Sequence, residues 1–227
     1  MGKGKQHLKR NAPTERVKRG AEDHRRREFE RASRSPKKQG PVVNFYEVAL
    51  NANGEGGEIL RKPSVEVEQP MSEEMFDLCG RLVWVTKHDP NCLGIAAPQV
   101  GVPVRIMTMR DNDGTVWCIV NPTVEHDQGA LRYSEYEGCF SLPDENAMVE
   151  RWTSVTVRGL APSGDPFERK FNGRAARVAQ HEMDHLDGVM IDSHGELKPV
   201  HGDVISTGET LDAESAEELI AALEAES

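Results

Sequence analysis

Gln-His-Glu-Met-Asp-His-Leu-Asp-Gly, residues 180–188, is the stretch from which the fold and chemistry of this sequence are inferred. Residues 174–186 contain no Gly or Pro and predict a helix. In a helix, His181 and His185 lie one turn apart on one face and can bind one metal ion. Glu182 then lies beside that ion, where a carboxylate can take a proton from an attacking water and pass it to a leaving amine. The pattern predicts metal-assisted hydrolysis, although the same spacing also occurs by chance on solvated helices.

Two histidines are one ligand short of a catalytic metal site, which typically has three protein ligands and an open position. In one metalloprotease pattern the third ligand is a histidine six residues after the second, but that position is Ile191. The remaining candidates are a downstream carboxylate, Glu196 or Glu209, and the thiol of Cys139. A thiolate with two imidazoles suits iron(II), zinc, cobalt or nickel.

The order of predicted elements favours an α+β fold. Ser72 is a candidate N-cap for a helix that ends near Asp89, and residues 59–65 before it are expected to be extended. Four short strands follow in two hairpins, at residues 104–109, 116–120, 154–158 and 167–171. Helix, strands and helix in this order predict an α+β arrangement with antiparallel strands and not an alternating parallel one.

Two further stretches have unusual composition. Residues 92–101 are mostly small, which lets a backbone approach a ligand or another element closely, and Gln99 supplies a side-chain donor and acceptor there. Gly138 and Pro143 interrupt regular structure, so Cys139 is expected on a short extended piece. Taken alone, a cysteine is more often buried and inert than a metal ligand.

Three separated blocks, in the same order as in the family, resemble the signature motifs of the peptide deformylase family. They are Gly94-Ile95-Ala96-Ala97-Pro98-Gln99, Glu137-Gly138-Cys139-Phe140-Ser141 and the stretch 180–188. The likeness spans about residues 57–191. It implies a peptide deformylase-like fold, in which antiparallel β-sheets pack around a central metal-binding helix. It also implies an enzyme that removes the formyl group from the N-terminal formylmethionine of newly made polypeptides and releases formate.

The resemblance also implies roles for particular residues. The implied metal ligands are Cys139, His181 and His185. Glu182 would be the acid/base group, and the amide of Gln99 with the backbone N–H of Phe140 would stabilise the oxyanion formed from the formyl oxygen. The expected cofactor is one divalent metal ion, Fe²⁺ physiologically, with Zn²⁺, Ni²⁺ or Co²⁺ as alternatives.

Substrate binding is expected from the backbone near Gly94, which would pair with the extended substrate as an added strand. The other expected substrate-binding residues are Leu93, Gly138, Phe140, Arg174, Arg177 and Val178. Three positions depart from the family pattern and affect substrate preference and not the chemistry: Cys92, Phe140 and Arg174. We also expect Glu137 to pair with Arg151 and so hold the cysteine segment.

Charge divides the chain into regions. Residues 1–40 contain 14 Lys/Arg and 5 Asp/Glu, whereas the remaining residues contain 14 and 33. We expect a disordered basic tail at 1–40, a catalytic domain at 41–203 and an acidic tail or short helix at 204–227. The basic tail predicts electrostatic contact with nucleic acid, the ribosome or an acidic surface, or it remains simply solvated. No membrane contact or specific DNA binding is expected.

Features that the sequence lacks indicate where the protein is located. It contains no apolar run of membrane-spanning length, no secretory signal and no Cys-x-x-Cys pair. We expect a cytoplasmic protein of a bacterial or phage-infected bacterial cell, with organelle import as the alternative. The competing functions are a peptidase on the same metal and a binding protein with an inert core.

Overall fold

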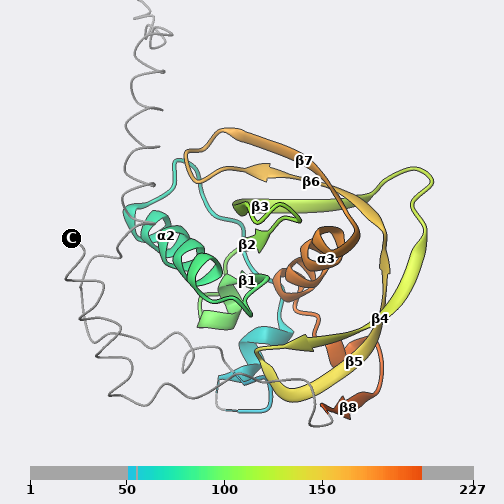
Figure 1. Cartoon of the computed structure of the whole chain (residues 1–227). Helices are drawn as coiled ribbons and strands as arrows, with labels where there is room; N and C mark the ends of the chain where they lie inside the picture. The colour runs from blue at the N-terminus through green and yellow to red at the C-terminus, as the bar shows by residue number, and fades with distance from the viewer. Residues whose placement is uncertain (1–50, 55, 201–227) are drawn as a thin grey trace, which may run out of the picture.

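The two histidines lie on helix α3 (Gly173–Asp187), whose bounds agree with the predicted helix to within one residue at each end. The computed structural model describes residues 51–54 and 56–200 and shows the expected α+β fold (Figure 1). Gly188 ends the helix with a φ of 75°. A Cβ at that position would lie 2.5 Å from the backbone carbonyl carbon of Lys62, so glycine is required on two counts.

A five-stranded antiparallel sheet runs from the middle of the molecule, at β1 and β2, to its upper edge, at β6 and β7, in the view of Figure 1. Its strands, in spatial order, are β1 (Gly94–Ala96), β2 (Ile106–Arg110), β3 (Val116–His126), β6 (Ser154–Leu160) and β7 (Pro166–Asn172). Both predicted hairpins, β2–β3 and β6–β7, are confirmed, and β3 continues six residues beyond the predicted strand end at residue 120. This continuation pairs with β6 and joins the two hairpins into one sheet.

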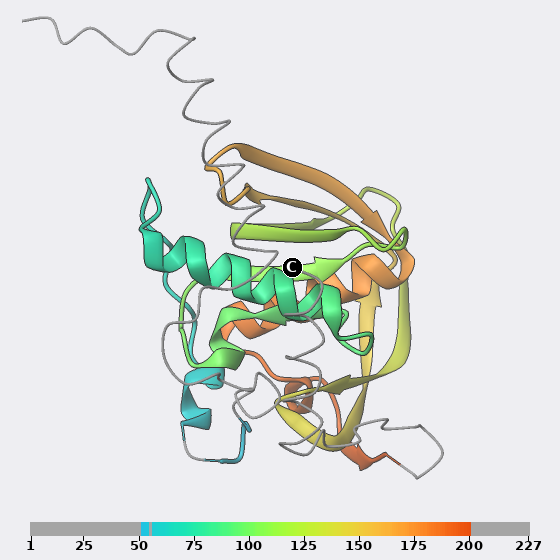
Figure 2. The same cartoon turned by 60° about the vertical axis from the view of Figure 1, so that its left-hand side comes forward.

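The two long helices cover opposite faces of the β1–β2–β3 part of this sheet (Figures 1 and 2). Helix α2 (Glu73–His88) begins at Ser72, whose hydroxyl accepts a hydrogen bond from Met75 N. Because side chains alternate along a strand, Ile106 packs with α2 and Met107 packs with α3. The middle strands are therefore buried on both faces, and α3 is held in the interior.

A second sheet lies against the other side of α3 and contains β4 (Arg132–Cys139), β5 (Leu142–Trp152) and β8 (Leu197–Pro199). The expectation that Gly138 and Pro143 interrupt regular structure is wrong, because both lie within strands. The ladder shifts register between Gly138 and Cys139, and Pro143 lies opposite this bulge with no paired residue in either neighbouring strand. A proline is tolerated at such a position because no ladder N–H is needed there.

Short 3-10 helices complete the described chain: η2 (Gly57–Arg61), η3 (Ala97–Val100) and η4 (Ile191–Ser193). Residues 59–65 are thus not an extended arm throughout, since their first part is helical and Val65 alone forms a bridge, with Val104. In the described ranges, no helix has the length and apolarity needed to cross a membrane. The expected basic tail, 1–40, and the expected acidic tail, 204–227, both lie wholly outside the described residues.

Candidate metal centre and active site

Helix α3 presents two histidines toward β4 of the second sheet and Glu182 toward Gly94 of β1. The imidazoles of His181 and His185 stand edge to face, with ring centroids 4.9 Å apart. Glu182 lies between them in sequence and is 4% exposed. One turn of helix therefore brings two imidazoles and a carboxylate to one buried place, as the spacing predicts.

The third candidate ligand comes from the end of β4. Cys139 Sγ lies 3.3 Å from His185 Nε2. One ligand atom from each of Cys139, His181 and His185 lies within 4.8 Å of the others. Of the two alternative carboxylates, Glu196 is exposed and does not join this group, and Glu209 is outside the described residues.

The electrostatics of this group fit a divalent cation. Burial raises the pKa of the Cys139 thiol, but the imidazoles of His185 and His181 outweigh burial and hold that pKa well below its usual value. The cysteine is thus ready to act as a thiolate, which is the form that binds metals. A thiolate and two imidazoles converging on one point are the donor set of a three-ligand catalytic site.

Glu137 orients one of the imidazoles from behind. His181 Nδ1 donates to Oε2 of Glu137 at 3.0 Å, which leaves Nε2 of that ring for the metal. The expected pair with Arg151 is present, because Nε and Nη2 of Arg151 donate to the two carboxylate oxygens at 3.1 and 3.0 Å. Burial opposes ionisation of Glu137, but the hydrogen bonds from His181 and Arg151 hold its pKa well below its usual value.

Glu182 has the properties of a general base. Its Oε2 is buried and has no hydrogen-bond partner among the described residues. Burial raises the pKa of Glu182 to about 7, even though the neighbouring imidazoles lower it. Gly94 packs against this side chain so tightly that a Cβ there would lie 2.4 Å from Oε1. The small residue at position 94 is therefore needed to make room for Glu182, a reason that the sequence did not reveal.

Gln99 is held on η3 in one orientation. Its Oε1 accepts the backbone N–H of Ala96 at 2.9 Å, so the amide NH₂ must point the other way. Nε2 lies 3.4 Å from Ser141 Oγ and 3.8 Å from Cys139 Sγ. An amide donor thus faces the candidate metal group. Sequence reasoning assigned no role to Ser141, although it belongs to the same motif as Cys139.

The expected substrate-binding residues are in contrasting environments. Gly94 is buried against Glu182, whereas Gly138 and Phe140 are exposed beside Cys139. Leu93 is half-buried and packs on the core cluster that contains Val178. Arg174 is exposed and makes no hydrogen bond or ion pair with any described residue. Arg177, in contrast, is buried and bonded to β4 and β5, which the sequence gave no reason to expect.

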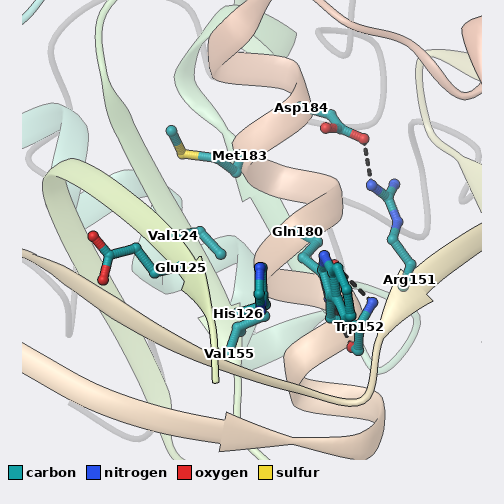
Figure 3. A pocket seen from close by; sticks show the side chains of 9 residues that line it. All are labelled: Val124, Glu125, His126, Arg151, Trp152, Val155, Gln180, Met183 and Asp184. Atoms are coloured by element: carbon teal, nitrogen blue, oxygen red, sulfur yellow. Dashed lines mark hydrogen bonds and ion pairs between the residues drawn. The ribbon is translucent and has the colours of Figure 1, made fainter. Parts of the chain in front are cut away.

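A hollow of about 560 Å³ lies elsewhere, between α3, the end of β5 and the neighbouring edges of β3 and β6 (Figure 3). His126 and Trp152 stack at one wall with ring centroids 4.1 Å apart. The polar groups beside them are already paired, since Gln180 bonds the backbone of Trp152 and Arg151 bonds Asp184. None of the candidate ligands lines this hollow.

The sequence model that describes the polypeptide deformylase family matches residues 53–199 of this chain. The chain belongs to the polypeptide deformylase family. Peptide deformylases of known sequence include one from Pseudothermotoga lettingae, 38% identical over 135 residues that cover 60% of this chain and 76% of that protein. Peptide deformylase 1 of Streptomyces coelicolor is 30% identical, over 72% of this chain and 84% of that protein.

Solved deformylase structures have the same fold. A class I type b peptide deformylase from Acinetobacter baumannii is 31% identical with a TM-score of 0.56, over 64% of this chain and 99% of that chain. A peptide deformylase from Synechococcus elongatus, solved in complex with actinonin, is 26% identical with a TM-score of 0.59, over 71% and 85%.

Membership of the deformylase family decides the class of activity. The protein is a metal-dependent hydrolase of N-terminal protein processing, and it removes the formyl group from the N-terminal formylmethionine of newly made polypeptides. The predicted activity and fold are thereby confirmed, and the peptidase and binding-protein alternatives are set aside.

Proposed function

We propose that Cys139, His181 and His185 hold the divalent cation on which deformylation depends, and that Glu182 and Gln99 carry the reaction beside it. The observation that supports this most directly is the convergence of the three ligand atoms within 4.8 Å of one another, from two elements far apart in sequence. The buried, unpaired Oε2 of Glu182 adjoins this group. When bound there, a divalent cation supplies Lewis-acid chemistry, polarising a carbonyl and lowering the pKa of a coordinated water.

Protein groups carry out proton transfer, stabilise the developing charge and bind the peptide. Glu182 takes a proton from the attacking water at its free oxygen and delivers it to the amine that leaves. Gln99 Nε2 and the backbone N–H of Phe140 donate hydrogen bonds to the formyl oxygen as negative charge develops on it. The exposed backbone near Gly138 and the short strand β1 pair with the extended peptide. Formate and a free amino terminus result.

We propose Fe²⁺ as the physiological ion, with zinc, cobalt and nickel as the alternatives, since a thiolate with two imidazoles suits all four. The test is formate release from formyl-Met peptides after anaerobic loading with each ion in turn. Iron(II) should give the highest kcat/KM at equal occupancy. A loaded protein that cleaves internal peptide bonds without releasing formate would contradict the proposal.

Glu182→Ala separates the base from the ligands. The variant should bind one equivalent of cobalt(II) as the parent does, yet lose about 10²–10⁴-fold in kcat, the usual contribution of a positioned acid/base group. Metal content and formate release are measured on the same sample. A loss of metal would move Glu182 into the ligand set, and activity within a few-fold of the parent would remove it from the mechanism.

We also propose a cytoplasmic location and a nascent-chain substrate met at the ribosome. The support is the charge of residues 1–40, which hold 14 basic and 5 acidic side chains while the rest of the chain is acidic. A basic segment on an acidic protein favours a polyanionic surface such as ribosomal RNA.

A further inference from the structure

Arg177 is a buried cation at the junction of the two elements that supply the proposed metal ligands. It lies on α3 four residues before His181, on the same face of the helix, and is 6% exposed. A guanidinium is seldom buried unless it is paired and fully hydrogen-bonded. Its contacts therefore show what the fold uses it for.

The guanidinium of Arg177 spans β4 and β5. Nη1 donates to Oε1 of Glu137 at 2.6 Å and to the carbonyl of Val149 at 3.0 Å. Nη2 donates to the carbonyl of Tyr133 at 3.0 Å, and the group lies over the Tyr133 ring with its central carbon 4.2 Å from the ring centroid. Nε lies 3.2 Å from a carboxylate oxygen of Glu135. One helical side chain thus binds three residues of β4 and one of β5.

These contacts lead directly to the proposed ligands. Glu137 lies two residues before Cys139 on β4, and its second oxygen accepts Nδ1 of His181. Arg151 also binds Glu137, but it comes from β5 and reaches α3 through Asp184. Without Arg177, the direct link from α3 to Glu137 would depend on His181, the same ring that must present Nε2 to the metal.

We propose that Arg177 is a positioning residue for the metal centre, which fixes the separation of Cys139 from the two histidines and the orientation of His181 through Glu137. The proposal rests on the ligand set proposed above. A planar guanidinium suits this role because it binds two backbone carbonyls and a carboxylate with donors fixed in one plane. A lysine ammonium cannot reproduce this geometry. Residues that orient metal ligands typically change metal affinity by about 10–100-fold when removed.

The test compares Arg177→Met with Arg174→Met, which lies one turn earlier on α3 and is exposed without a described ion pair. Two properties are measured on the full-length protein: the cobalt(II) dissociation constant by chelator competition, and the sulfur-to-cobalt absorption band. Arg177→Met should weaken cobalt binding about 10–100-fold and shift the band. Arg174→Met should match the parent in both, because it removes the same charge from the same helix without touching β4.

A folded Arg177→Met protein with the parent's affinity and spectrum overturns the proposal. If that variant does not fold, Arg177→Lys is measured instead, since the lysine keeps the charge but cannot bridge β4 and β5. A cobalt affinity and absorption band like the parent's in Arg177→Lys would overturn the proposal as well. Weakened cobalt binding with a shifted band would support it. Cys139→Ser tests the ligand set separately by its loss of the sulfur band. Retention of that band would overturn the ligand set itself, whatever the arginine variants show.

Discussion

A hydrogen bond to its side-chain oxygen orients Gln99, so that its NH₂ group points toward the proposed metal ligand Cys139. Because Oε1 accepts the Ala96 N–H, the side chain arrives preorganised as a donor and need not rearrange when charge develops on the formyl oxygen. We expect Gln99→Ala to fold and bind metal, and to lose about 2.7–4 kcal/mol of transition-state stabilisation, or about 10²–10³-fold in kcat. Formate release at saturating substrate measures it, and near-normal turnover would exclude Gln99 from the mechanism.

Gly94 is the residue whose small size protects the position of Glu182. A Cβ at 94 would lie 2.4 Å from Oε1 and 2.8 Å from two carbons of the glutamate, so the whole carboxyl group must move. We expect Gly94→Ala to lower kcat about 10²-fold or more by displacing the acid/base group.

A double-mutant cycle shows whether Gly94 acts through Glu182. Adding Gly94→Ala to Glu182→Ala should cost no further activity, because the group that the new methyl displaces is already gone. Additive losses would mean that Gly94 acts elsewhere, for instance through the backbone that faces the substrate. Cobalt content, measured on all four proteins, controls for damage to the ligands.

At the scale of elements, the junction between α3 and β4 depends on one carboxylate shared by two buried arginines. Glu137→Gln removes the buried carboxylate that both arginines bind, which leaves Arg151 only the less buried Asp184 and Arg177 only the exposed Glu135 as anionic partners among the described residues. Removal of one partner from a buried pair typically costs about 3–5 kcal/mol. Arg151→Met should cost less, because Arg177 still neutralises Glu137. Denaturant unfolding of the metal-free proteins gives both values, so that metal binding does not contribute. If Arg151→Met loses as much unfolding free energy as Glu137→Gln, or more, this distribution of charge is contradicted.

Exchanging the charges of Glu137 and Arg151 would be a less informative experiment, since it would place an arginine against Arg177.

The same junction shows how far the sequence could predict the fold. Helix α3 follows from local rules, since an uninterrupted run with glycine beyond it predicts its bounds. The β4–β5 hairpin does not, because Gly138 and Pro143 locally favour a break, and the bulge that accommodates them exists only once the two strands pair. The role of Arg177 was equally hidden, since its partners are 28 to 44 residues away in the chain. The resemblance to the family placed Cys139 with the histidines, whereas spacing alone left two glutamates as alternatives.

At the scale of the whole molecule, charge is divided between the amino-terminal segment and the rest. Residues 1–40 carry a net charge of +9 and the remaining chain −19, counted from the Lys, Arg, Asp and Glu of the sequence. The negative charge of ribosomal RNA repels an acidic enzyme, and a basic segment can offset this repulsion at short range. Such attraction between exposed charges weakens as salt shortens the Debye length from about 10 Å at 0.1 M to about 3 Å at 1 M.

Deletion of residues 1–40 therefore tests where the enzyme meets its substrate. The full chain should co-sediment with ribosomes at low salt and be released as salt rises, whereas the deleted chain should stay in the supernatant at every salt concentration. Replacing Arg25, Arg26 and Arg27 by glutamine should give an intermediate salt midpoint, because binding of this kind depends on the number of charges. Formate release from a short formylated peptide should be unchanged in both variants, since the described catalytic domain is untouched. A full chain that fails to sediment even at low salt would contradict the ribosome proposal and favour the alternative of a solvated basic segment.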